Sequence, residues 1–432
     1  MSQLLEWKEH RNRKPLIMYG ARQVGKSWLL REFGATCYAK TAYIDLAEND
    51  RMRAVFAGDF DVNRIIHAIA VETGIEITLA DTLIIVDEIQ AEPRAITSLK
   101  YFCERAPEYH IVAAGSLLGV ALHESYSFPV GKVDSMILRP MSFREFLVAR
   151  GESLLAQAID DRDGLDLSSV FAGKLQDYLK EYLVVGGMPA VVDDFCKHHD
   201  YLEARRLQRL ILDDYDRDFS KHAPLRILEK MRQVWDSIPS QLARENRKFV
   251  YGLVRDGARA RDYEEAIQWL VDYGALDKVS RVSAIRSPLK SYQELPSFKL
   301  FMLDVGLTSA MSGLDFRTVL NGSALFTEFK GALTEQYVNQ QLVAATYTPY
   351  YWSSSADAEV DLLVELHGEP LPIEVKAAEN LRSKSLKSAQ QRFGLNKAVR
   401  TSLSLFRDEG WLVNIPLWAI SSIANLMNVQ KP

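Results

Sequence analysis

Eight consecutive residues near the start of the chain have the types and spacing needed to hold phosphate. Two glycines frame the segment, and a lysine and a serine follow the second one: Gly20, Ala21, Arg22, Gln23, Val24, Gly25, Lys26 and Ser27. Glycine tolerates backbone angles that turn successive N–H groups towards an anion, and a helix beginning near Lys26 adds its positive dipole end. We therefore expect Lys26 to reach the β- and γ-phosphates of a nucleotide and Ser27 to ligate Mg²⁺. The alternative is a plain glycine turn with a chance lysine.

The flanking residues give this loop the setting that phosphate binding requires. An apolar run over residues 15–19 predicts a buried strand before the loop, and residues 28–33 have a helical pattern after it. Strand, glycine loop and helix in this order make the motif a predicted nucleotide site, in which we include Trp28. We expect the ligand to be ATP with Mg²⁺, because no Asn-Lys-x-Asp-like guanine-reading motif occurs.

A second apolar run ends in two acids. Residues 81–86 predict a strand, and Asp87 and Glu88 follow it directly. Ligands of parallel sheets lie at the carboxyl ends of the strands, which places Asp87 where a Mg²⁺-linked carboxylate is needed. Glu88 is placed to polarise an attacking water, which favours hydrolysis over nucleotide storage. Helix capping by this acidic pair is the alternative.

Further strands complete the predicted first domain. Residues 43–46 predict one strand, and residues 109–116 predict another that ends at Ser116, placed to sense the γ-phosphate or orient water. Ordinary turn chemistry also explains a Gly-Ser pair at a strand end. Because these strands alternate with helical segments, we expect an α/β fold with a parallel sheet between helical layers.

A different set of charged residues occurs near the C-terminus. Asp361 lies in one predicted strand, and Glu374 and Lys376 lie on the same side of the next strand after a His-Gly turn. Two such carboxylates can hold a Mg²⁺ ion that activates water, and Lys376 can stabilise the negative charge that develops on the phosphoryl oxygens. Glu335 on a preceding helix could complete the set, and Gln391 is a further candidate. The alternative is a strand with solvated charges on its exposed face.

The flanks of this pattern favour a site. Glu374 stands in an apolar stretch, where a charge without a purpose is costly. A basic cluster follows that could face a phosphate backbone: Arg382, Lys384, Lys387, Arg392, Lys397 and Arg400.

The middle of the chain gives weaker signals. Gly186, Gly187 and Pro189 interrupt a helical run, which fits close approach to a ligand or a simple helix–helix turn. The helical pattern over residues 262–273, its glycine stop and the strand over 275–282 resemble the end of a winged helix-turn-helix. Such a module can read DNA or serve only as a packing unit.

Composition is that of an ordinary globular protein and argues against a strongly basic nucleic-acid binder or a membrane-spanning protein. The chain has 432 residues, 47% hydrophobic content and 25% charged content, as ordinary globular proteins have. The net charge of −5 gives no global basic field for nucleic acid. Three cysteines without metal-ligand spacing favour a reducing, cytoplasmic location. We expect no membrane span, since no apolar stretch is long enough.

Together these motifs resemble prokaryotic AAA+-like ATPases that carry a C-terminal domain of unknown function. The resemblance covers nearly the whole chain and rests on residues 20–27, 84–90, 114–116, 140–147, 186–189, 329–335 and 373–376. It implies a P-loop nucleotide domain related to AAA+ and signal-transducing (STAND) ATPases, a winged-helix region, and a restriction-endonuclease-like domain similar to PD-(D/E)XK nucleases.

The resemblance also implies roles for single residues. Ser116 takes the sensor-1 position, and Gly187 with Pro189 takes the nucleotide-side turn of STAND proteins. The nuclease-like positions fall on Glu335, Asp361, Glu374 and Lys376. Lys132 stands where relatives are expected to carry an arginine finger. A lysine is a poorer donor there because it lacks the planar guanidinium group of arginine. Arg139 is an alternative for this role.

Four segments follow from these patterns. Residues 1–150 form the predicted ATPase domain, 151–225 a helical lid, 226–295 a winged-helix-like segment and 296–432 the nuclease-like domain. One interpretation is a Mg²⁺-dependent ATPase coupled to DNA through its last two segments. The other is a nucleotide-gated switch whose C-terminal domain is a non-catalytic module that binds a partner protein or a second copy of the chain.

Overall fold

The computed structural model of the chain describes residues 1–79, 81–115, 128–244, 247–321, 327–354, 358–377 and 383–427. Two compact units are present, one made of Met1–Arg139 with Asp272–Gly274 and one made of Pro140–Val271 with Ala275–Pro432. Ser116 and Arg382 lie outside the described residues. In the part of the chain that is described, no helix has the length and apolar character needed to cross a membrane.

The first unit is built on a five-stranded parallel sheet with the order β2-β3-β4-β1-β5. Its strands are β1 (Leu16–Tyr19), β2 (Lys40–Asp45), β3 (Thr82–Asp87), β4 (His110–Ala114) and β5 (Asp134–Ile137). All strands are parallel, so their carboxyl ends lie at one edge of the sheet. β4 lies between β1 and β3 and thus separates the strand before the glycine loop from the strand that ends at Asp87.

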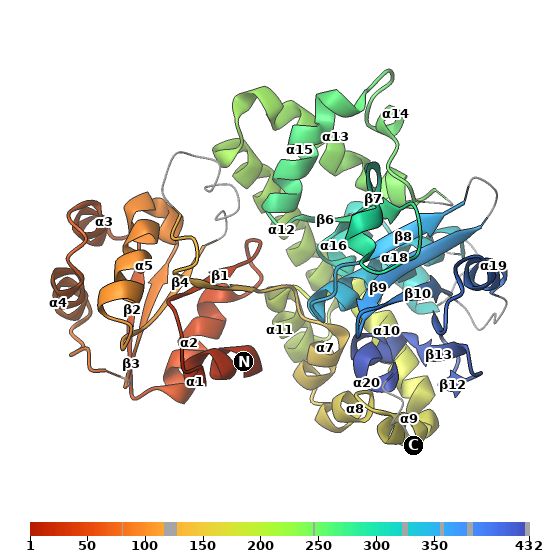
Figure 1. Ribbon diagram of the computed structural model, residues 1–432, viewed down its shortest axis with the longest axis horizontal. Coiled ribbons are helices and arrows are strands. Elements are labelled where there is room, and N and C mark those ends of the chain that lie inside the picture. The colour runs from red at the N-terminus through yellow and green to blue at the C-terminus, as the bar shows by residue number, and fades with distance from the viewer. Residues whose placement is uncertain are drawn as a thin grey trace. The chain divides into compact units, whose positions relative to one another are not determined.

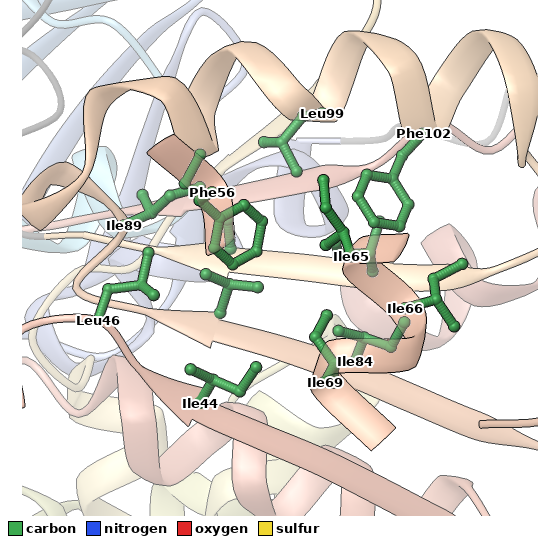
Figure 2. Packing of buried hydrophobic residues seen from close by; sticks show 14 of the residues in the cluster. Ile44, Leu46, Phe56, Ile65, Ile66, Ile69, Ile84, Ile89, Leu99 and Phe102 are labelled. Carbon is green, nitrogen blue, oxygen red and sulfur yellow. The ribbon is translucent and has the colours of Figure 1, made fainter. Parts of the chain in front are cut away.

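Helices cover both faces of this sheet, as expected for buried parallel strands (Figure 1). One face packs on α1 (Ser2–Glu9) and α2 (Lys26–Cys37). The other packs on α3 (Asp50–Ala57), α4 (Val62–Thr73) and α5 (Pro93–Arg105). Figure 2 shows this second core, in which side chains of α4 and α5 point at those of β2 and β3. The central strands β3 and β4 are buried along their whole length, because both faces of the sheet are covered.

The second unit contains an eight-stranded mixed sheet with the order β12-β13-β11-β10-β9-β8-β6-β7. The strands are β6 (Leu276–Val282), β7 (Gln293–Met302), β8 (Tyr350–Ser353), β9 (Glu359–Leu366), β10 (Glu369–Val375), β11 (Ala398–Ser402), β12 (Arg407–Asp408) and β13 (Leu412–Pro416). β9 and β10 form the predicted antiparallel pair, whereas β10 and β11 run parallel.

Helices make up the rest of the second unit. They are α7 (Phe143–Ala149), α8 (Ser153–Ala158), α9 (Arg162–Ser168), α10 (Ala172–Val185), α11 (Pro189–His198), α12 (Tyr201–His222), α13 (Leu225–Leu242), α14 (Tyr251–Val254), α15 (Ala260–Asp272), α16 (Val305–Met311), α17 (Phe316–Asn321), α18 (Thr327–Ala344), α19 (Lys384–Phe393) and α20 (Ile423–Met427), with short 3₁₀ turns between some of them. Ser142 and Glu145 form the reciprocal hydrogen bonds of a capping box before α7.

The β6–β7 hairpin belongs to the same sheet as the C-terminal strands. β6 pairs in parallel with β8, so the segment expected to be winged-helix-like shares its strands with the segment expected to be nuclease-like. A boundary at residue 295 therefore falls inside one sheet, and inside β7 itself. Pairing of β6 with β8 joins strands some seventy residues apart and leaves no local signal in the sequence. Sequence patterns therefore place the two strands in different segments, although they belong to one sheet.

Candidate functional site

The glycine loop connects β1 to α2 through three residues with positive φ. They are Gly20 at 151°, Gln23 at 64° and Gly25 at 92°. A Cβ on Gly20 would lie 2.5 Å from the Leu138 carbonyl oxygen, so this position excludes any side chain. Gly25 is in the left-handed region immediately before α2, where glycine carries no steric penalty. The loop conformation thus depends on the two glycines of the motif.

Lys26 is the first residue of α2, and its side chain folds back over the loop. It is only 7% exposed, and its Nζ donates hydrogen bonds to the carbonyl oxygens of Gly20 at 2.9 Å and Ala21 at 2.8 Å. The ammonium is thereby held inside the curve of the loop. Binding of a phosphate there requires Nζ to exchange loop carbonyls for phosphate oxygens.

Asp87 ends β3 in a fixed orientation. Tyr43 on β2 donates a hydrogen bond from its hydroxyl to Asp87 Oδ2 at 2.8 Å, and the Glu88 amide donates to Oδ1 at 2.9 Å. The Arg31 guanidinium lies 3.8 Å from the centre of the Tyr43 ring. Asp87 is 2% exposed, so these contacts position a buried carboxylate. Sequence patterns gave no role to Tyr43, because its contact to Asp87 depends on strand pairing.

Glu88 is set apart from Asp87 by a turn of the backbone. It has a φ of 48°, which ends the strand and begins the short turn Ile89–Ala91. Burial and the neighbouring Asp87 raise the pKa of Glu88, while the Gln90 amide, Arg22 and Lys26 lower it in part. A carboxylate with a raised pKa is a stronger base, as proton abstraction from water requires.

These residues fit a magnesium-bound nucleotide. Lys26, Asp87 and Glu88 lie at the carboxyl ends of β1 and β3, and Arg22 and Lys26 are close enough to Glu88 to affect its pKa. The loop has no room for a side chain at Gly20, and it holds the buried ammonium of Lys26. Such a loop can bind an anion.

Other predicted nucleotide residues have mixed surroundings. Ser27 is half-buried, whereas Trp28 is 68% exposed. Lys132 forms an ion pair with Glu104 at 3.0 Å, and Arg139 is half-buried. The roles given to these residues and to Ser116 stay predictions.

The Gly-Gly-Met-Pro turn is packed tightly inside the second unit. The Gly187 amide donates to Asp304 Oδ2 at 2.6 Å, and a Cβ on Gly187 would lie 2.0 Å from the Met141 carbonyl oxygen. Gly186 has a φ of 74°, and Pro189 is the first residue of α11. These contacts account for both glycines and the proline through chain packing, so the nucleotide contact predicted for Gly187 and Pro189 stays a prediction.

The residues expected at the nuclease-like positions come together in the second unit. Asp361 on β9 accepts a hydrogen bond at its Oδ2 from the Val375 amide of β10 at 2.8 Å. Glu374 is 5% exposed and its Oε1 lies 2.7 Å from the Lys376 Nζ. Its Oε2 is buried with no hydrogen-bond partner among the described residues. Gln391 is exposed on α19.

Two cations from elsewhere in the chain engage the acids beside Asp361. The Lys299 Nζ on β7 lies 2.9 Å from Glu335 Oε1 and 2.7 Å from Glu359 Oε1. Arg247 binds the other oxygen of Glu335. Burial alone raises the pKa of Glu335, but Arg247 and Lys299 outweigh it and lower the pKa below its usual range. Both oxygens of Glu335 are therefore committed to side chains of this protein.

The metal ligation predicted for Asp361 and Glu374 stays a prediction. Burial, followed by the charge of Glu335, raises the pKa of Asp361 to about 7, although part of the residue remains exposed. Among the described residues no group of three or more His, Cys, Asp or Glu side chains could hold a metal ion.

Sequence reasoning missed Lys299, Arg247 and Glu359. Lys299 interrupts the apolar run Phe298–Met302, and a single charge inside a buried strand is a signal for a buried partner. Arg247 and Glu359 carry no comparable signal, since Arg247 stands beside Lys248 and Glu359 is one of several acids that alternate along its segment. Their roles depend on the fold that brings three segments together.

Three family models match parts of the chain. Residues 12–147 match an AAA domain, residues 176–318 match a domain of unknown function (DUF8612), and residues 330–418 match a second domain of unknown function (DUF4143). The first match covers the glycine loop, Asp87 and Glu88. This match and the geometry of these residues support a P-loop NTPase domain in the first unit.

Similar proteins add little beyond this. Two uncharacterized proteins, one from Mycobacterium bovis and one from Mycobacterium tuberculosis, are each 37% identical over 94 residues. The matched stretch covers 21% of this chain and only 20% of the length of those relatives.

Two solved structures are remotely similar. A Walker-type ATPase of Pyrococcus abyssi is 16% identical with a TM-score of 0.44, and the match covers 72% of this chain and 93% of that chain. Drosophila ORC bound to DNA is 15% identical with a TM-score of 0.25, over 65% of this chain and 86% of that chain.

Proposed function

We propose that the first unit binds ATP with Mg²⁺ and hydrolyses it. The observation that carries the proposal is the placement of a basic carboxylate, Glu88, within the electrostatic reach of Lys26 at one edge of a parallel sheet. An isolated glycine loop would account for binding alone. The buried Asp87 and the raised pKa of Glu88 add the groups that hydrolysis needs.

Each residue has a distinct role in this proposal. The amides of residues 20–27 and the Lys26 ammonium would bind the phosphates, and Ser27 and Asp87 would hold Mg²⁺. The ion supplies charge neutralisation at the transferred phosphoryl group. Glu88 orients a water molecule and accepts its proton, while Gln90 holds the Glu88 carboxylate in place.

The test is ATP hydrolysis with Mg²⁺ in the wild type, Glu88→Gln and Lys26→Ala. We expect Glu88→Gln to bind ATP with near-normal affinity while its kcat falls at least about 100-fold, because only proton abstraction is removed. Lys26→Ala should lose tight binding. Normal turnover in either variant contradicts the roles assigned here.

We also propose coupling of this ATPase to DNA, through the β6–β7 region and the nuclease-like positions. The intact Glu374–Lys376 pair and the orphan Oε2 of Glu374 support it. Single- and double-stranded DNA should then raise the ATPase rate, and any Mg²⁺-dependent cleavage should vanish in Glu374→Ala. Cleavage that survives this substitution rules out the assigned residues.

A second candidate is a nucleotide-gated switch with a non-catalytic C-terminal domain. It is favoured by the ion pairs of Glu335 with Lys299 and Arg247, which commit one of the predicted nuclease-like acids to side chains of this protein. ATPase turnover that is slow and indifferent to DNA, with no cleavage in Mg²⁺ or Mn²⁺, is the result expected of this candidate.

A further inference from the structure

We infer that the Lys299 ammonium serves as the built-in cation of a carboxylate cluster formed by Glu335, Glu359 and Asp361, and that removing it creates a divalent-cation site. The proposal concerns the second unit alone. It neither requires ATP hydrolysis nor follows from it, so its test can fail while the proposed ATPase stands.

Lys299 is surrounded by oxygen atoms in the manner of a bound ion. Its side chain is fully buried, with 0% exposure. The Nζ atom meets Glu335 Oε1 at 2.9 Å, Glu359 Oε1 at 2.7 Å and the Asp361 carbonyl oxygen at 3.4 Å. These oxygens come from α18 and β9, and the lysine comes from β7. One ammonium thus joins three elements that are distant in sequence.

The remaining sides of the cluster are also closed by this chain. The Tyr351 ring centre lies 4.8 Å from the Lys299 Nζ, a cation–π contact. Arg247 takes the second oxygen of Glu335, and a Cβ on Gly331 would lie 2.9 Å from its Nη2. Gly331 therefore gives the guanidinium room beside α18. A divalent ion entering this arrangement would meet two fixed positive charges.

The oxygen donors that surround Lys299 are those that hard divalent cations prefer. Carboxylate and carbonyl oxygens bind Mg²⁺, Ca²⁺ and Mn²⁺ at roughly 2.0–2.6 Å. Without the lysine, the buried Glu335 and the partly exposed Glu359 would be left with only Arg247 to offset their charges. Buried carboxylates without partners are strongly destabilising, so a cation from solution should bind in place of the ammonium.

The test compares Lys299→Ala with the parent protein in an Asp87→Asn background, which removes the predicted magnesium ligand of the first unit. Melting temperature is measured with and without MnCl₂, and Mn²⁺ binding is followed by electron paramagnetic resonance. Lys278→Ala is the matched control, because it removes a half-buried lysine of the adjacent strand that contacts Phe298 and no carboxylate in the described structure.

We expect Lys299→Ala to melt lower and to recover by roughly 2–4 °C or more with Mn²⁺, saturably. Adding Glu335→Gln should abolish the recovery. The parent protein and Lys278→Ala should show neither binding nor recovery. A lysine variant that Mn²⁺ does not stabilise, or that folds in neither condition, overturns the inference. Mn²⁺ binding by the parent protein that is lost on Glu335→Gln overturns it as well.

Discussion

Tyr43 shows how one hydroxyl can orient a buried carboxylate. Its hydrogen bond to Asp87 Oδ2 at 2.8 Å leaves the carboxylate little freedom, and the Arg31 cation lies against its ring. Burial, followed by the charge of Asp87, raises the pKa of Tyr43 to about 12, so the hydroxyl stays a donor at any working pH. Groups that orient a ligand in this way commonly affect metal affinity.

We therefore predict that Tyr43→Phe weakens the apparent affinity for Mg²⁺ in ATP hydrolysis. The Mg²⁺ concentration giving half-maximal rate should rise roughly 10-fold, with a smaller change in kcat, because Asp87 keeps its charge but loses its orientation. Tyr101→Phe, which removes a hydroxyl from α5 instead, is the control. An unchanged Mg²⁺ requirement in Tyr43→Phe would show that Asp87 needs no such support.

A second residue-scale prediction concerns His110 at the start of β4. Burial, followed by Arg13 and Lys8, lowers its pKa to about 4, and its Nδ1 lies 2.6 Å from the Tyr38 hydroxyl. The unfolded chain takes up this proton near pH 6.5 and the folded chain only near pH 4, so stability is full above pH 6.5 and falls between these values.

Denaturant unfolding at pH 7.5 and 4.5 tests this. On acidification, the free energy of unfolding of the wild type should fall by on the order of 2 kcal/mol more than that of His110→Gln, because glutamine cannot take up the proton. Parallel losses in the two proteins would mean that His110 titrates normally in the folded state.

At the scale of elements, the turn between α10 and α11 is tightly enclosed by the second unit. Asp304 accepts hydrogen bonds from the amides of Gly187 and Leu307 and from the Gln340 side chain. Gly306 is also enclosed, since its Cβ would lie 2.6 Å from the Val185 carbonyl oxygen. The turn therefore fixes how α10, α16 and α18 pack.

Gly187→Ala should destabilise the second unit by about 3 kcal/mol or more, because the new methyl group would collide with backbone at 2.0 Å. Gly173→Ala in α10 is a matched control, since its Cβ would meet nothing within 4 Å. That change should be neutral or stabilising by up to about 1 kcal/mol. Equal unfolding midpoints for the two variants would contradict the packing described for the turn.

At the scale of the whole molecule, two units have separate hydrophobic cores. The first unit is closed on both faces of its five-stranded sheet, and the second has its own cluster over β8 and β9. Units with independent cores can unfold independently. A ligand that binds one of them stabilises only that unit by mass action.

We accordingly predict two calorimetric transitions. ATP with Mg²⁺ should raise one transition, an effect that Lys26→Ala abolishes, whereas Gly187→Ala should lower the other. A single transition that responds to both changes would show that the units unfold as one body. The experiment also separates nucleotide effects from packing effects without an activity assay.

The sequence by itself determined the glycine loop and the acidic strand end of the proposed nucleotide site, because the residues that form each of them are close together in the chain. Gly20, Gly25 and Lys26 act within one turn, and Asp87 and Glu88 are adjacent. Their spacing encodes local backbone geometry, and apolar runs before each segment predict parallel strands. The loop, the strand ends and the capping box at Ser142 all follow from such short-range patterns.

Only the tertiary structure decided the surroundings of the C-terminal acids. The sequence predicted the β9–β10 hairpin that carries Asp361, Glu374 and Lys376. Lys299 and Arg247 reach the same place from distant segments, and they commit Glu335 to ion pairs. Whether a buried acid binds a metal ion or a lysine depends on which side chains the fold places beside it. Strand pairing and packing between segments far apart in sequence decide this.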